Sequence, residues 1–196
     1  YLFSWQERIV DLLLYRLLNA KLGPTMAAHS YAYRPGPFGL DRCQRAIKRA
    51  LGDGSSKRFL VKRDITDFFN RIDHERLAQR LAAHVDPNDY LFKLLMQRVR
   101  FLYLRDGHEA EAKQGVAFGT SVACALANLY LQPLDDALSA IPGLRSFRYA
   151  DDLLMVAPDA AVGRQAQVAV ATALAELKLE SKPSHALDLL YTPKEC

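Results

Sequence analysis

FRYADDLLMVA, residues 147–157, decides how this chain folds, because two adjacent carboxylates separate two short apolar runs. If residues 147–149 and 153–157 are strands, Asp151 and Asp152 occupy the tip of a hairpin. Carboxylates that share a site raise each other's pKa, so the pair is unfavourable unless a cation joins it. Carboxylate oxygens suit Mg²⁺, with Mn²⁺ as the alternative ion. A solvated turn is the other interpretation of an isolated Asp-Asp pair.

A third carboxylate, Asp64, closes the apolar strand that we expect over residues 59–65. A charge at the end of a buried strand is costly unless it has a partner. Together with Asp151 and Asp152, it supplies three carboxylates that neighbouring strands can bring to one edge. Such a set can hold two divalent ions, which activate an attacking hydroxyl and stabilise a leaving pyrophosphate. Taken alone, Asp64 is equally typical of a helix N-cap or a strand end.

The rest of the chain indicates a mixed α+β domain with helices packed on one face of a small antiparallel sheet. Asp73 is expected to cap a helix that runs to about residue 84. A long helix over 120–138 is expected to be interrupted near Pro133. Further helices are expected at residues 3–22, 40–51, 89–101 and 160–177, and a strand with a turn at 102–107.

The net charge of +4 and the pI near 9.0 permit an anionic partner but do not require one. A basic cluster precedes Asp64, which suits a polyanion that is brought to metal ions, although a solvated helix face has the same pattern. The cluster comprises Arg42, Arg45, Lys48, Arg49, Lys57, Arg58, Lys62 and Arg63. Three widely spaced cysteines, Cys43, Cys124 and Cys196, form neither a disulfide framework nor a zinc spacing.

Four motifs in order resemble those of reverse transcriptases of the group II intron and retron kind. They are SYAYRPG at residues 30–36, RDITDFFNRIDH at 63–74, the glycine-led segment 119–131 and YADD at 149–152. The resemblance implies a right-hand polymerase fold with a small antiparallel palm sheet. It places the fingers at about 1–58 and 75–112 and the palm at about 59–74 and 113–190. On this basis residues 1–196 are a fingers–palm portion, and the thumb is expected to lie outside the chain.

The resemblance also implies roles for single residues. Asp64 and Asp151 would bind two Mg²⁺ ions with Asp152 beside them, and Ile65 would lend its backbone carbonyl to one ion. Phe69 would lie under the sugar and exclude a 2′-hydroxyl, because a ring there leaves no room for the extra oxygen. A core phenylalanine is the other interpretation of Phe69.

Two basic residues take implied roles in the same way. Lys182 resembles the lysine of the fourth palm motif, where it could pair with the departing pyrophosphate or give it a proton. An exposed lysine after a helix is the alternative. Arg34 would contact the template or a phosphate, or else stack beside Tyr31 and Tyr33.

The chain departs from the family pattern just before Gly119. A Pro-Gln pair is usual there, but this sequence has Ala117-Phe118, so we expect Phe118 to stack on the incoming nucleotide in place of the glutamine contact. Gln114-Gly115 offers another register.

The resemblance implies RNA-templated DNA synthesis, in which a primer 3′-hydroxyl attacks a deoxynucleoside triphosphate. An RNA-dependent RNA polymerase, an untemplated nucleotidyltransferase, and a polymerase-like module that only binds RNA or a protein remain alternatives. The expected partners are an RNA template, a DNA or RNA primer, dNTPs, and a protein partner or fused domain. No apolar run has membrane-spanning length, so we expect no membrane contact and a cytoplasmic location. Enzymes of this kind serve intron mobility or antiviral defence, among other roles, and the residues do not choose among them.

Overall fold

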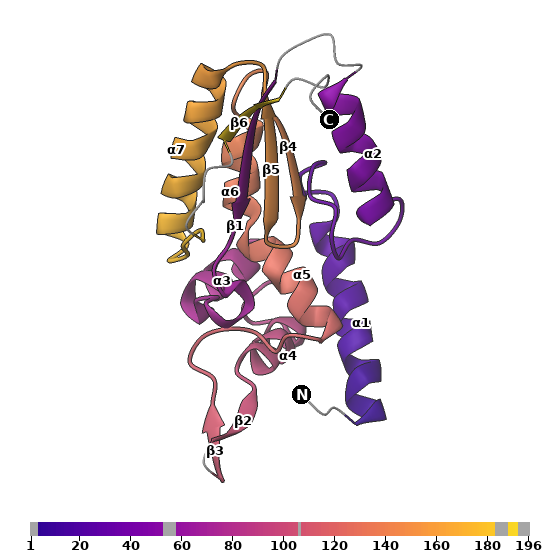
Figure 1. The fold of residues 1–196 in the computed structure, drawn as a ribbon. Helices are drawn as coiled ribbons and strands as arrows, with labels where there is room; N and C mark the ends of the chain where they lie inside the picture. Colours follow the sequence, from indigo (N-terminus) through magenta and orange to yellow (C-terminus); the bar gives the residue numbers. More distant parts are fainter. Residues whose placement is uncertain (1–3, 53–57, 106, 183–187, 192–196) are drawn as a thin grey trace. The chain divides into compact units, whose positions relative to one another are not determined.

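The computed structural model describes residues 4–52, 58–105, 107–182 and 188–191. The chain divides into two compact units, each built from two separate segments (Figure 1). Unit 1 contains Tyr1–Met26 and Asp67–Leu131, and unit 2 contains Ala27–Thr66 and Gln132–Cys196. These boundaries do not coincide with the expected fingers and palm segments, whose assignment stays a prediction.

Unit 2 is organised around an antiparallel sheet, which has the strand order β4-β5-β1-β6 in the described residues. Its strands are β1 (Arg58–Asp64), β4 (Arg145–Tyr149), β5 (Asp152–Ala157) and β6 (Asp188–Tyr191). Its helices are α2 (Leu40–Leu51), α6 (Gln132–Ser139) and α7 (Ala160–Glu176). The expected hairpin over residues 147–157 is therefore the β4–β5 pair, and the mixed α+β fold class is confirmed.

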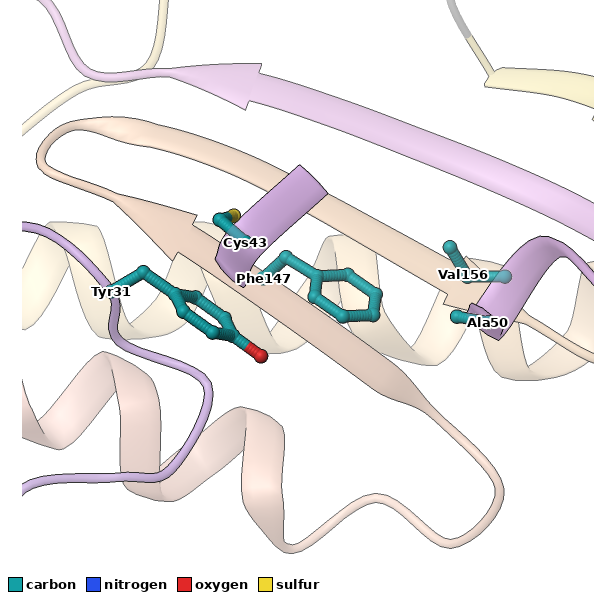
Figure 2. Packing of buried hydrophobic residues seen from close by; sticks show 5 residues of the cluster. All are labelled: Tyr31, Cys43, Ala50, Phe147 and Val156. Atoms are coloured by element: carbon teal, nitrogen blue, oxygen red, sulfur yellow. The ribbon is translucent and has the colours of Figure 1, made fainter. Parts of the chain in front are cut away.

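Helices cover both faces of this sheet, not the single face expected. The apolar side of α2 packs over Phe147 and Val156 through residues such as Cys43 and Ala50 (Figure 2). Successive side chains of a strand point to opposite faces, so Phe59 lies on the other face, where its ring packs against Gly163 of α7. Strands that are apolar on both sides need cover on both sides, which is the physical reason for the difference.

Unit 1 is mostly helical. Its helices are α1 (Trp5–Leu22), the 3-10 turn η1 (Phe68–Asn70), α3 (His74–Ala82), α4 (Tyr90–Val99) and α5 (Ser121–Tyr130). A two-stranded sheet joins β2 (Leu102–Arg105) to β3 (His108–Glu111). Apolar α5 is buried along almost its whole length against its neighbours, and Asp11 of α1 accepts hydrogen bonds from the backbone N–H groups of Ser121 and Val122 at its start. A carboxylate at that position satisfies donors that the helix leaves unpaired.

Most expected elements are present. The expected interruption of the helix over residues 120–138 is confirmed, because α5 ends at Tyr130 and α6 begins at Gln132, which places Pro133 in the first turn of α6, where a missing N–H is tolerated. Strands β3 and β6 were not expected, because neither carries a strong apolar alternation. Asp73 does cap α3, since its side chain accepts a hydrogen bond from the N–H of Arg76.

Both cysteines that the structure describes, Cys43 and Cys124, carry free thiols, and Cys196 lies outside the described residues. Burial raises the pKa of the Cys43 thiol. Burial, reinforced by the charge of Asp11, raises the pKa of the Cys124 thiol to about 11. Both thiols are therefore protonated at neutral pH. Among the described helices, none combines the length and apolar character needed to span a membrane.

Candidate active site

The three predicted carboxylates meet at one end of the sheet of unit 2. Asp64 is the last residue of β1, and it pairs across the ladder with Asp152, the first residue of β5. Tyr149 closes the hairpin opposite Asp152, which leaves Ala150 and Asp151 at its tip. The register of β1 against β5 therefore brings Asp64 to the Asp151–Asp152 turn, as the sequence predicted.

Lysines lie beside Asp64 and Asp152. The Nζ atom of Lys182 donates to Oδ2 of Asp64 at 2.7 Å, and Lys62 Nζ lies 3.8 Å from Oδ1 of Asp152. The backbone holds Lys182 in place, because its N–H donates to the carbonyl of Asp64 and the next bridge joins Ile65 to Ser181. Pro183 and Ser184 of the same predicted motif lie outside the described residues.

The electrostatics of the turn favour a cation. Burial raises the pKa of the Asp151 carboxyl, and the charges of Asp64 and Asp152 raise it further, against the lowering effects of its backbone hydrogen bond and of Lys182. The hydrogen bond to Asp64 is the main reason why the pKa of Lys182 is raised. A positive charge added near Asp151 would lower the cost of ionising it.

One oxygen at this site has no partner in the described part of the chain. Oδ1 of Asp64 is buried and accepts no hydrogen bond, although Oδ2 of the same group is paired with Lys182. A buried carboxylate oxygen without a donor is costly, and a metal ion would satisfy it. The residues present thus fit a divalent ion in their chemistry. The described residues do not, however, include a group of three or more acidic, histidine or cysteine side chains already gathered for metal binding.

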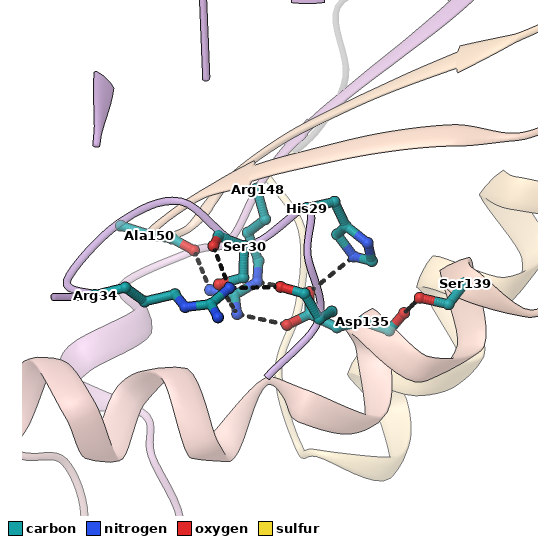
Figure 3. Close-up of polar contacts among 8 residues, drawn as sticks. His29, Ser30, Arg34, Asp135, Ser139, Arg148 and Ala150 are labelled. Atoms are coloured by element: carbon teal, nitrogen blue, oxygen red, sulfur yellow. Dashed lines mark hydrogen bonds and ion pairs between the residues drawn. The ribbon is translucent and has the colours of Figure 1, made fainter. Parts of the chain in front are cut away.

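The hairpin that carries the turn is anchored by a buried arginine that the sequence motifs did not single out. Arg148 lies inside β4, and its guanidinium pairs with Asp135 of α6 at 2.8 Å from Nε and 2.6 Å from Nη2 (Figure 3). His29 lies 3.4 Å from the same carboxylate. Burial opposes the ionisation of Asp135, but the Arg148 charge and its hydrogen bonds, assisted by His29, hold the pKa of Asp135 below its usual range. The available signal was an arginine between the aromatic residues Phe147 and Tyr149 of a strand, because an arginine that is buried there needs a charged partner.

Arg34 is engaged within its own loop. Its Nη1 donates to the carbonyls of Ala27 and Ser30, and its guanidinium lies 3.7 Å from the centre of the Phe38 ring. This geometry matches the predicted stacking role, with Phe38 in place of Tyr31 or Tyr33 as the ring. The predicted template contact stays a prediction.

The predicted nucleotide-side aromatics lie in unit 1, where the structure brings them together. The Phe69 ring packs edge-on against Phe118, with ring centres 5.0 Å apart, and also against Phe68 at 5.3 Å. Phe68 is buried, Phe69 is half-buried and Phe118 is 61% exposed. Gly119 follows with a φ of +93°, a conformation that favours glycine. The core interpretation therefore suits Phe68 better than Phe69, and the sugar-excluding role of Phe69 stays a prediction.

The predicted basic cluster is spread over several elements. Its members on α2 (Arg42, Arg45, Lys48 and Arg49) are exposed, and the Arg42 guanidinium lies 5.9 Å from the centre of the Phe38 ring. Lys62 pairs with Asp152, Arg63 donates to a neighbouring carbonyl, and Lys57 lies outside the described residues. Both earlier interpretations, polyanion binding and a solvated face, stay open for α2.

Comparisons with known proteins identify the family and the fold. The family described as "Reverse transcriptase (RNA-dependent DNA polymerase)" matches residues 5–185. Apo telomerase from Candida tropicalis superposes with a TM-score of 0.67 at 10% identity, over 92% of this chain and 36% of the telomerase chain. Telomerase from Candida albicans, in a complex with a fragment of telomeric RNA, gives a TM-score of 0.67 at 14% identity, over 94% of this chain and 35% of its own. At these identities the likeness shows the fold, and the chain spans little more than a third of these relatives. No curated protein matches the sequence.

Proposed function

The chain belongs to the reverse transcriptase family, and from that membership we propose that it carries the catalytic centre of an RNA-templated DNA polymerase. The proposed reaction adds a deoxynucleotide to the 3′-hydroxyl of a DNA or RNA primer and releases pyrophosphate. The RNA template, the primer and dNTPs are the proposed partners, together with a protein partner or fused domain. The group II intron or retron subtype, a role in antiviral defence and a cytoplasmic location stay predictions.

The observation that supports this proposal most directly is the unpartnered Oδ1 of Asp64 beside the Asp151–Asp152 turn. We propose that Asp64, Asp151 and Asp152 hold two Mg²⁺ ions, with Mn²⁺ as the alternative, and that the Ile65 carbonyl assists. Bound ions of this kind activate the primer hydroxyl and neutralise the charge that develops on the pyrophosphate. The pKa of the Asp151 carboxyl is raised, as is expected for a carboxylate that is placed to meet a cation.

Lys182 is proposed to serve the leaving group. Its ammonium is exposed and charged at neutral pH, since the hydrogen bond to Asp64 raises its pKa. An exposed ion pair exchanges partners at little cost, so Lys182 can leave Asp64 for a phosphate oxygen when Asp64 takes an ion. There it would donate a hydrogen bond or a proton to the pyrophosphate.

Selection between deoxynucleotides and ribonucleotides is proposed to depend on Phe69 and Phe118. The edge-on contact between the two rings fixes the half-buried Phe69 ring, and the exposed Phe118 offers a face for stacking. Phe69→Ala should therefore increase the incorporation of ribonucleotides relative to deoxynucleotides. Unchanged discrimination would remove Phe69 from this role, and a wild-type preference for ribonucleotides would favour an RNA polymerase.

Primer extension by the full-length protein on poly(rA) with an oligo(dT) primer and Mg²⁺ tests the central proposal. Asp151→Asn should lower the rate by about a thousandfold, because ion-mediated charge stabilisation is worth several kcal/mol. Asp41→Asn, which removes an exposed carboxylate from the first turn of α2, is the matched control and should retain the wild-type rate. Full activity in Asp151→Asn would contradict the proposed mechanism. A wild-type protein that binds RNA but extends no primer would favour the binding module.

A further inference from the structure

The guanidinium of Arg148 donates hydrogen bonds to several groups at once. Beyond its two bonds to Asp135, Nη2 donates to Oγ of Ser30 at 2.8 Å, and Nη1 donates to the carbonyl of Ala150 at 3.1 Å (Figure 3). The Arg148 side chain is 1% exposed and that of Asp135 is 3% exposed. The planar fork of an arginine can serve these groups at once, whereas a lysine ammonium cannot match that geometry.

The contact with Ala150 bears directly on the turn, because the backbone of Ala150 is strained. Its φ is +57°, in the left-handed region that residues with a Cβ rarely adopt. Ala150 immediately precedes Asp151, and its carbonyl belongs to the peptide that joins the two residues. Arg148 therefore binds the peptide group whose orientation decides where the Asp151 backbone starts.

The other contacts of Arg148 hold it against two further segments. Asp135 comes from α6, and the backbone of Arg148 is bonded on both sides to the 29–31 segment, through the His29 carbonyl and the Tyr31 N–H. Ser30 is fully buried in this segment. The arginine thus connects a helix and an extended segment of unit 2 to the tip of the β4–β5 hairpin.

Stability alone does not explain this choice of residues. Replacing a buried ion pair with apolar side chains of similar volume is often neutral or stabilising, so such a pair is weak evidence of a stabilising role. An apolar pair would, however, leave the Ala150 carbonyl without its donor. We propose that Arg148, oriented by Asp135, is a positioning residue that holds the left-handed Ala150–Asp151 turn so that Asp151 stays beside Asp64. The effect on catalysis rests on the proposed polymerase function.

Two substitutions in the full-length protein test this role. Arg148→Lys keeps the charge opposite Asp135 but loses the fork, and it should lower kcat about tenfold or more while KM for dNTP changes less than about threefold. Hydrogen exchange in the peptide that spans residues 149–153 should accelerate by about tenfold. Adding Ala150→Gly to Arg148→Lys should raise kcat about threefold and slow the hydrogen exchange about threefold relative to Arg148→Lys alone, because glycine adopts a positive φ without steric cost.

Val170→Ala is the matched control, since Val170 is buried in α7 and is no part of the turn. It should lower thermal stability but leave exchange at 149–153 and kcat near wild type. If Val170→Ala loosens the turn as much as Arg148→Lys, the arginine is only structural and the proposal is overturned. Wild-type exchange and kcat in Arg148→Lys would also overturn it.

The role of Arg148 can be tested even if Arg148→Lys does not fold or the wild-type protein is inactive. If Arg148→Lys does not fold, Ser30→Ala provides a nearly isosteric substitution that removes one hydrogen bond of the guanidinium. Hydrogen exchange at the turn should still rise by about threefold. Unchanged exchange in Ser30→Ala would then overturn the proposal. If the wild-type protein extends no primer, the polymerase proposal fails by itself, and the exchange measurement still decides whether Arg148 holds the turn.

Discussion

Two ion pairs near the Asp151–Asp152 end of the unit 2 sheet have similar lengths and opposite surroundings. Lys182–Asp64 measures 2.7 Å between side chains that are 55% and 35% exposed, whereas Arg148–Asp135 measures 2.6 Å between side chains that are 1% and 3% exposed. The exposed pair can exchange partners at little cost. The buried pair cannot be opened without leaving a charge unpaired in the interior. Ion pairs of the same length are therefore exchangeable where they are exposed and fixed where they are buried.

The largest effect is expected from breaking the buried pair. Arg148→Met leaves the Asp135 carboxylate buried without its main partner, so the free energy of unfolding should fall by about 3–5 kcal/mol. Urea denaturation followed by circular dichroism would measure this loss. Arg148→Met combined with Asp135→Leu should recover most of it, because no unpaired charge remains. A single variant as stable as wild type would show that the pair is not the fixed element described above.

A smaller effect, of opposite sign, is expected at the turn. The pKa of Asp151 is raised above its ordinary value of 3.8, so its contribution to stability is fully present below pH 3.8 and is lost as pH rises through the raised pKa. Asp151→Asn has no such loss and should therefore be more stable than wild type at neutral pH in EDTA. Urea denaturation from below pH 3.8 to neutral pH should measure the difference in the free energy of unfolding between Asp151→Asn and wild type. This difference should grow as pH rises and vanish in acid.

Asp135 gives the contrasting control for that titration. Its pKa is lowered, so its contribution to stability is present above the pKa of the unfolded state and is lost as pH falls through the folded pKa.

Excess Mg²⁺ should raise the stability of wild type but not of Asp151→Asn, because only wild type keeps the complete carboxylate set. A stabilising effect of Mg²⁺ on both proteins would contradict the proposed ion site.

The smallest effect is expected at the most exposed pair. Lys62 and Asp152 are separated by 3.8 Å, with side chains 57% and 61% exposed. Lys62→Gln should change the free energy of unfolding by about 0.5 kcal/mol or less, and salt should remove even that difference. The same urea experiment at low and high ionic strength measures it. A loss comparable to that of Arg148→Met would remove the distinction between exposed and buried pairs.

Local patterns were enough to predict much of the fold and the central residues of the site. The helix cap at Asp73, the strand that ends in Asp64 and the hairpin around Asp151 each follow from residues within a few positions of one another. Such features depend on capping, apolar runs and turns, which short windows of sequence contain. The resemblance to reverse transcriptases added the roles, and the family match supports that membership.

The contacts that the sequence did not predict join distant segments. Strand β6 pairs with β1, α2 covers the second face of the sheet, and Ser30 reaches Arg148 across 118 positions. Neither periodicity nor composition specifies which buried arginine meets which buried aspartate. Those partners depend on sheet register and helix packing, which emerge only when the whole unit is assembled.

The sequence by itself thus determined that three carboxylates would stand at strand ends and at a hairpin tip, because local chemistry places them there. Only the tertiary structure decided that Asp64 would pair opposite Asp152, and that Arg148 and Asp135 would hold the turn from below. The physical reason is that a strand end is a local property, whereas the register between two strands and the partner of a buried charge are properties of the packed core.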